Sequence, residues 1–208
     1  RGNVINPDDV VDKFGADSLR LYEMFMGPLD KSKPWSTKGL HGCHRFLQKV
    51  WRLINDNGFK IKNNCSSNET NVLLHKTIKK ITEDLNELRF NTAVSQLMIF
   101  TNHLNTLKEL DRNVLHQFLI LLNPFAPHIA EELNQEIGFN QITSLDWPVY
   151  DKSLVIDEKV IIAVQFNGKK RGTLEVISGA SEDEILKQLR SSSFGDKYLS
   201  QGEIIKVI

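Results

Sequence analysis

The fold is decided by residues 119–133, which read LILLNPFAPHIAEEL. The run begins as the apolar end of a helix. Pro124 stops that helix because proline lacks an amide donor and disfavours helical backbone in the residue before it. Pro127 suits the first position of a second helix, where the missing amide has no intrahelical partner. Because Phe125 and Ala126 between them are apolar, we predict a helix–helix corner buried against other helices.

Apolar residues recur at three- and four-residue spacings on both sides of this corner, which is typical of amphipathic helices. Asn6, Ser36, Asn91 and Asp111 are predicted to begin helices, since their side chains can accept from first-turn amides. Residues 60–68, rich in Asn and Ser, are expected to form a solvated loop. Helices are predicted over 7–14, 17–26, 36–57, 91–104, 111–122 and 127–137. A further helix is predicted from the apolar stripe over 74–88. This order predicts an antiparallel helical bundle.

The apolar period changes to two after residue 157. Residues 160–166 and 173–176 alternate as strands do, and Asn167-Gly168 between them is a strong hairpin signal. Ser181 and Glu184 form a capping box that begins a helix, and residues 204–208 are expected to form a last, truncated strand. The predicted fold is mainly α: the bundle, a connector at 147–157, and a small α+β unit of β-β-α-β order.

Composition limits the possible functions. The formal net charge is zero, with +3 over residues 1–60, −3 over 61–149 and zero beyond, so any basic surface is local. No apolar run is long enough to span a bilayer, which excludes a membrane segment. Two cysteines in 208 residues suit a reduced, cytoplasmic protein. The opening RGNVINP has neither an initiator Met nor an apolar leader, which predicts a fragment of a longer protein.

Two groups of cations are the candidate site residues. Arg45, Lys49 and Arg52 share one face of a predicted helix, and they either contact RNA phosphates or form an ordinary solvated face. The solvated face is favoured from the sequence alone, since most charged stripes face water. Lys169, Lys170 and Arg171 follow the hairpin turn, where strand alternation sends Lys170 to the opposite face from the other two. Such a cluster can neutralise phosphates, and the sequence favours neither interpretation.

The sequence gives little support for a catalytic site or a metal site. His41, Cys43, His44 and Cys65 do not converge as the four ligands of a structural zinc would, so no metal is expected. His128 is expected to bond within the hinge and not to act as a base. The glycines around the hairpin join two strands, whereas a phosphate loop opens a helix. No catalytic residue is predicted.

Several motifs together carry a family resemblance. The motifs lie at 1–7, 15–20, 26–28, 35–36, 45–52, 89–93, 124–133, 147–151 and 164–172. On these motifs the chain resembles class I aminoacyl-tRNA synthetases of the bacterial leucyl type, from just after their Lys-Met-Ser-Lys-Ser loop. Asn134 stands where that family often has tryptophan.

The resemblance implies a monomeric, cytoplasmic parent enzyme that attaches leucine to its tRNA with ATP and Mg. It divides the chain into a segment that follows the signature loop (1–35), an anticodon-binding-type bundle (36–148) and a C-terminal tRNA-binding domain (149–208). The fragment would position tRNA for leucine, hold no cofactor and be inactive alone. The alternatives are a stand-alone helical protein-interaction domain, or the same region of a valyl or isoleucyl enzyme.

Overall fold

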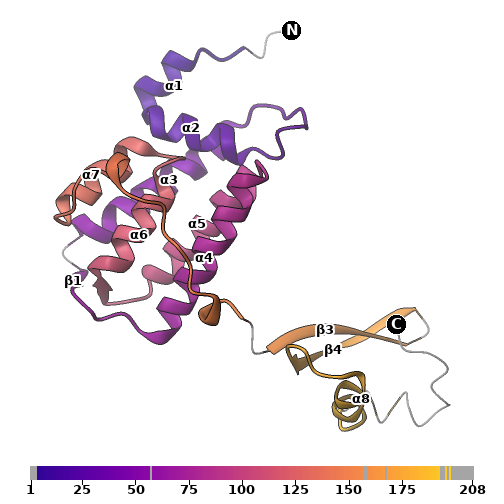
Figure 1. The fold of residues 1–208 in the computed structure, drawn as a ribbon. Helices are drawn as coiled ribbons and strands as arrows, with labels where there is room; N and C mark the ends of the chain where they lie inside the picture. The colour runs from indigo at the N-terminus through magenta and orange to yellow at the C-terminus, as the bar shows by residue number, and fades with distance from the viewer. Residues whose placement is uncertain are drawn as a thin grey trace. The chain divides into compact units, whose positions relative to one another are not determined.

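The structure, a computed structural model, describes residues 4–56, 58–156, 159–166 and 168–192, together with Gly195 and Lys197. Its contacts divide the chain into two compact units, residues 1–155 and 156–208. The first is helical and the second carries a small sheet (Figure 1), which confirms the predicted mainly α fold. Within the described residues, no helix is both long and apolar enough to cross a membrane.

The helical unit is a bundle in which α2 contacts α3, α5 and α7, while α4 packs on α5 and α6 on α7. Buried apolar side chains from all of these helices form one continuous core. The bounds are α1 Pro7–Phe14, α2 Ala16–Phe25, α3 Thr37–Asn55, β1 Lys60–Lys62, α4 Asn68–Asn86, α5 Phe90–Leu104, β2 Glu109–Asp111, α6 Arg112–Leu122, α7 Pro127–Glu136, η1 Ile142–Ser144 and η2 Lys152–Leu154.

Polar side chains begin four of these helices. Asn6, Ser36, Ser67 and Asp111 each accept a hydrogen bond from a first-turn amide of the helix that follows. Each bond satisfies an amide that has no partner within its own helix. The predicted starts at Asn6, Ser36 and Asp111 are therefore confirmed.

The corner between α6 and α7 is buried, as the sequence predicts. α6 ends at Leu122, and Pro127 occupies the first turn of α7. Phe125 and Ala126 between them are fully buried. The Phe125 ring meets the Phe90 ring of α5 edge to face, with centroids 6.4 Å apart. Burial of an apolar hinge removes it from water and fixes the angle between the two helices.

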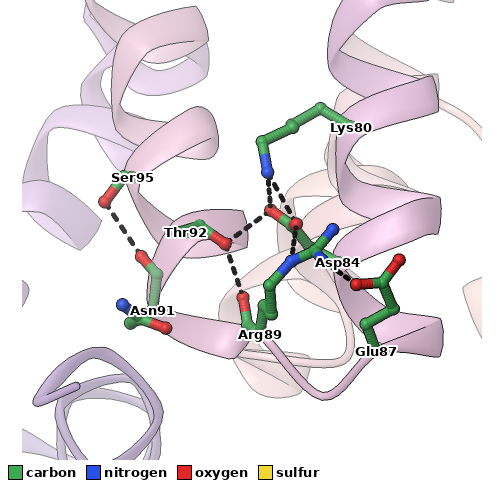
Figure 2. Close-up of polar contacts among 7 residues, drawn as sticks. All are labelled: Lys80, Asp84, Glu87, Arg89, Asn91, Thr92 and Ser95. Atoms are coloured by element: carbon green, nitrogen blue, oxygen red, sulfur yellow. Dashed lines mark hydrogen bonds and ion pairs between the residues drawn. The ribbon is translucent and has the colours of Figure 1, made fainter. Parts of the chain in front are cut away.

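A buried carboxylate organises the corner between α4 and α5 (Figure 2). The side chain of Asp84 is fully buried and accepts from Lys80 Nζ at 2.6 Å, Arg89 Nε at 2.8 Å and Thr92 Oγ1 at 2.7 Å. Burial alone would raise the pKa of Asp84. The hydrogen bonds from Lys80, Thr92 and Arg89 outweigh burial and hold that pKa below its usual value.

Two predictions fail at this corner. Leu88 was expected in the core, but it is 58% exposed with φ at +55°. It takes the left-handed position after the helix, because Leu88 N bonds Leu85 O and Arg89 N bonds Asp84 O, which is the Schellman pattern. Asn91 is not a cap, since α5 already begins one residue earlier.

The expected loop at 60–68 contains a strand. β1 pairs in parallel with β2, Lys60 with Glu109 and Lys62 with Asp111. Lys62 Nζ also donates to Glu109 Oε1 at 2.5 Å. A three-residue parallel strand gives almost no alternation, so the pattern of the sequence alone could not reveal it.

The C-terminal unit is a two-stranded antiparallel sheet covered by one helix. It contains β3 Lys159–Phe166, β4 Lys169–Ile177 and α8 Glu182–Arg190. The buried apolar residues in the described part of this unit are Val164, Leu174, Val176 and Leu189. The capping box of Ser181 and α8 is present as predicted. The predicted last strand at 204–208 lies outside the described residues.

Candidate functional site

The first candidate surface is the outer face of α3. The inner face of this 19-residue helix is buried against the bundle through Leu40, Cys43, Phe46, Leu47, Val50 and Leu53. Arg45, Lys49 and Arg52 lie on the opposite side and are exposed. We call these three residues the α3 stripe. Because six buried side chains fix the helix, the stripe presents its charges from a rigid backbone.

The beginning of α3 is held by an aromatic cluster. Ser36 N donates to Tyr22 Oη at 2.7 Å, and the Trp35 ring meets the Tyr22 ring edge to face at 4.9 Å. A Cβ on Gly39 would lie 2.9 Å from the Tyr22 ring, so glycine permits this close contact. The cluster ties α3 to α2 and so fixes the position of the stripe.

The α3 stripe carries uncompensated positive charge. Within the described part of the chain, none of its three cations forms an ion pair with a carboxylate. Lys49 Nζ donates to the neutral Asn102 Oδ1 of α5 at 3.4 Å. Lys38, seven residues before Arg45, is exposed and extends the same row. Lys38 was not among the predicted site residues, although its seven-residue spacing from Arg45 is visible in the sequence.

The second candidate surface is the tip of the β3–β4 hairpin. Gly168 has φ at +75°, as a tight turn needs, and Lys169, Lys170 and Arg171 are exposed. We call these three residues the hairpin cations. Lys170 pairs with Gln165, and the register then shifts by one residue around Arg171.

This shift is a β-bulge, which the sequence analysis did not foresee. Gly172 pairs with Val164, so Lys170 and Arg171 together lie opposite the single residue Gln165. The predicted strict alternation, with Lys170 alone on one face, is therefore wrong. Lys169 pairs with Phe166, and the Phe166 ring packs against the small core of this unit. Lys169 therefore lies on the core face of the sheet.

The polar residues Asp17, Arg20 and His128 near the corner stabilise the fold. Asp17 of α2 accepts from the α7 amides of His128 at 3.3 Å and Ile129 at 2.8 Å, and so caps α7 from another helix. His128 Nδ1 also bonds Asp17 Oδ1 at 2.8 Å, so its partner lies on α2 and not within the hinge as predicted. Arg20 Nε and Nη2 both donate to Pro124 O, at 3.0 and 2.8 Å.

The cysteines and histidines that were considered as metal ligands do not form a metal site among the described residues. Cys43 is buried, and burial raises the pKa of its thiol to about 11. His44 bonds Ser18 at 3.1 Å, and Cys65 N donates to Asp111. Among the described residues, no group of three or more His, Cys, Asp or Glu side chains could hold a metal ion.

The geometry therefore gives two cationic surfaces, one in each unit. Residues 71–186 match the family model described as the anticodon-binding domain of tRNA ligase. The chain belongs to this family. The matched residues of the anticodon-binding family run from α4 into α8, so they include the hairpin cations, whereas the α3 stripe precedes them.

Longer relatives extend the likeness to the whole chain. It is 44% identical over 212 residues to the leucine–tRNA ligase of Chlorobaculum tepidum, and 45% identical over 213 residues to that of Chloroherpeton thalassium. Each match covers 100% of this chain but only 26% of the relative, so the chain spans about a quarter of their length. The relatives favour the leucyl type over the valyl and isoleucyl alternatives.

A solved structure agrees with this fold. The ternary complex of the Agrobacterium radiobacter K84 agnB2 LeuRS with tRNA and LeuAMS matches 99% of this chain and 29% of that chain. The TM-score is 0.78 at 29% sequence identity. The resemblance to leucyl-tRNA synthetases, first identified from motifs, is thus confirmed by sequence and by fold.

Proposed function

We propose that this chain is the tRNA-binding part of a leucine–tRNA ligase. The observation that carries the proposal is the α3 stripe, three exposed cations without a described carboxylate partner on a rigid helix. Phosphate contacts from such a row would position an RNA without reading its sequence. The leucine–tRNA ligases that match the whole chain, and the tRNA in the similar complex, support tRNA for leucine as the RNA.

The proposal assigns the reaction to the rest of the enzyme. Leucine activation needs ATP, with Mg, and Gly168 and Gly172 do not form a phosphate loop, because they lie in a β-hairpin. The three parts proposed for binding are residues 1–35, 36–148 and 149–208. The compartment proposed is the cytoplasm, which suits the two free cysteines. A monomer is proposed as the working state.

The α3 stripe and the hairpin cations are proposed to have one role in common. Both are exposed and cationic, and neither surface has the converging nucleophile, base and acid of a catalytic site. A basic surface that contacts phosphates binds RNAs of similar shape almost equally. Discrimination among tRNAs would then come mainly from shape.

The test is binding of a leucine tRNA transcript to the whole chain and to its variants. Replacing Arg45, Lys49 and Arg52 with Ala should weaken binding by roughly tenfold or more, since charged hydrogen bonds are worth about 1.5–3 kcal/mol each. The matched control replaces Lys13, Lys60 and Lys108 with Ala. It removes the same charge from exposed positions outside the stripe.

The control separates a specific surface from net charge. If the control weakens binding as much as the stripe variant, the RNA follows overall charge and the stripe has no special role. If the parent chain does not bind tRNA at all, the proposed function is wrong. A loss confined to the stripe variant, of similar size for a second tRNA of comparable shape, supports it.

A further inference from the structure

Trp51 is the one exposed tryptophan of the chain. It is 40% exposed, and among the described residues it is the only aromatic in the group of exposed large apolar side chains. It takes no part in the buried core. Trp35 and Trp147 are half-buried instead, and their Nε1 atoms donate to Thr37 and Thr82. Trp51 Nε1 makes no hydrogen bond to any described residue.

Trp51 lies on the flank of α3, between its buried face and the α3 stripe. At about 100° per residue, Arg52 is the stripe cation nearest to it around the helix. Its neighbours at helical spacing are the apolar Leu47 and Ile54 on one side and the exposed Gln48 and Asn55 on the other. Asn55 donates to Glu136 Oε2 of α7 at 2.8 Å.

An exposed indole is costly to leave in water, and tryptophan is enriched where a partner covers it. The chemistry around Trp51 identifies the kind of partner. Arg52 is the nearest cation of the α3 stripe, whose three cations form no ion pair with a described carboxylate. Cations beside an aromatic face suit a nucleotide, whose phosphate meets the cations while its base covers the ring.

A protein partner would need a larger apolar surface. Trp51 is the only exposed large apolar side chain of α3, and a stable protein interface needs about 800 Å² on each side around a desolvated centre. One indole supplies only a fraction of that area. A single base, by contrast, has about the area of one indole, so RNA fits this site better.

We propose that Trp51 stacks on an unpaired base of the bound tRNA while the α3 stripe holds the neighbouring phosphates. The inference rests on the proposed tRNA-binding function and adds a contact to it. The base must be unpaired because bases inside an A-form helix are stacked on each other and cannot reach a side chain. The contact would place a loop or bulge of the tRNA over the outer face of α3.

Stacking and phosphate contacts respond differently to salt, which makes the contact testable. Trp51→Leu keeps an apolar side chain but removes the aromatic face, and should weaken tRNA binding by roughly 5- to 100-fold. The slope of log affinity against log salt should stay unchanged, because no counterion is released by a neutral ring. Trp51→Phe should recover most of the affinity, while a fully paired RNA duplex should bind all three chains alike.

Fluorescence tests the same contact without changing Trp51. The double variant Trp35→Phe, Trp147→Phe leaves Trp51 as the sole indole of the chain. Addition of the leucine tRNA transcript should quench its emission and protect it from acrylamide. Trp51→Phe, which keeps the other two tryptophans, is the matched control and should show no tRNA-dependent quenching.

The outcomes separate the inference from the function on which it rests. If Trp51→Leu binds tRNA like the parent, or if tRNA leaves Trp51 open to acrylamide, the stacking contact is wrong. The proposed function still stands in that case, provided that the α3 stripe variant loses affinity. If the parent chain does not bind tRNA, both proposals are wrong.

Discussion

The helical unit and the C-terminal unit hold their cations on very different supports. The α3 stripe stands on a helix that buries six side chains in a core shared by all the bundle helices. The hairpin cations stand at the end of a two-stranded sheet, whose core has four buried apolar residues among those that the structure describes. The first surface is therefore set by packing from many elements, and the second mainly by local turn and strand geometry.

This difference in support predicts that the two surfaces lose different amounts of conformational freedom when they bind RNA. A stripe on a packed helix keeps its charges at fixed spacing, so little ordering is needed on binding. The hairpin cations are long side chains around a bulge and would lose more freedom when they bind. We expect the larger share of phosphate contacts from the α3 stripe.

The largest effect is expected from the core of the helical unit. Phe125→Ala should lower the free energy of unfolding by about 3–5 kcal/mol, because the ring is fully buried in the corner. Tryptophan emission during urea unfolding measures this unit alone, since Trp35, Trp51 and Trp147 all lie within residues 1–155. An unchanged midpoint would mean that the corner is not packed as described.

Val164→Ala is the matched change in the other unit. It removes buried volume from the small C-terminal core, where Val164 is 7% exposed. If the two units unfold independently, this variant should leave the tryptophan-detected midpoint unchanged. A shift as large as that of Phe125→Ala would show that the two cores act as one cooperative unit.

A smaller effect is expected at the α4–α5 corner. Asp84→Asn should cost about 2–3 kcal/mol at pH 7, since it weakens charged hydrogen bonds to a buried group. The control Glu87→Gln alters an exposed ion pair with Arg89 and should cost less than about 1 kcal/mol. Equal costs would contradict the central position of Asp84 in this network.

The same carboxylate predicts a pH dependence. Because the folded pKa of Asp84 lies below its usual value, its contribution is complete above the unfolded value of about 3.9 and is lost as the pH falls through the folded value. The difference in unfolding free energy between the parent and Asp84→Asn should shrink over that acidic range. A constant difference from pH 7 to pH 2 would contradict the assigned role of the charge.

The hairpin cations should give the smallest effect. If two of the three contact phosphates, replacing Lys169, Lys170 and Arg171 with Ala should lower the salt slope by about 1.4–1.8, at roughly 0.7–0.9 per contact. Affinity for leucine tRNA and for another tRNA of comparable shape should fall alike. An unchanged slope would identify the cluster as an ordinary solvated turn.

The sequence predicted features that depend on near neighbours. The buried corner follows from Pro124 and Pro127, and the starts of α6 and α8 follow from Asp111 and Ser181. The helical periods also predicted that Arg45, Lys49 and Arg52 would share one exposed face. Such features are determined within one or two turns of the chain, so pattern and propensity suffice to find them.

Features that depend on distant residues were missed. Asp17 caps α7 from 111 residues away, which explains why His128 bonds α2 and not the hinge. Leu88 was missed for a local reason: backbone bonds at the end of α4 require a left-handed residue there, and a stripe of apolar residues gives no sign of such an ending. The bulge at Arg171 arises from pairing across the hairpin, which strand alternation alone cannot reveal.

Asn134 shows how a local departure from a family can be compensated at a distance. It is fully buried, at a position where the family resemblance predicts tryptophan. His116 Nδ1 bonds its Oδ1 at 2.7 Å, and its Nδ2 donates to Asn140 O at 2.7 Å. Because Oδ1 can only accept, His116 must carry its proton on Nδ1. The polar side chain is thus satisfied, and the packing of α7 on α6 is kept.

The salt dependence of tRNA binding tests the central claim most directly. The claim is that the α3 stripe holds RNA phosphates, so affinity of the parent and of the Arg45, Lys49 and Arg52 triple Ala variant should be measured across a salt series. Three lost contacts should lower the slope of log affinity against log salt by about 2.1–2.7, at roughly 0.7–0.9 each. A slope equal to that of the parent would contradict the claim, whatever the change in affinity at any one salt concentration.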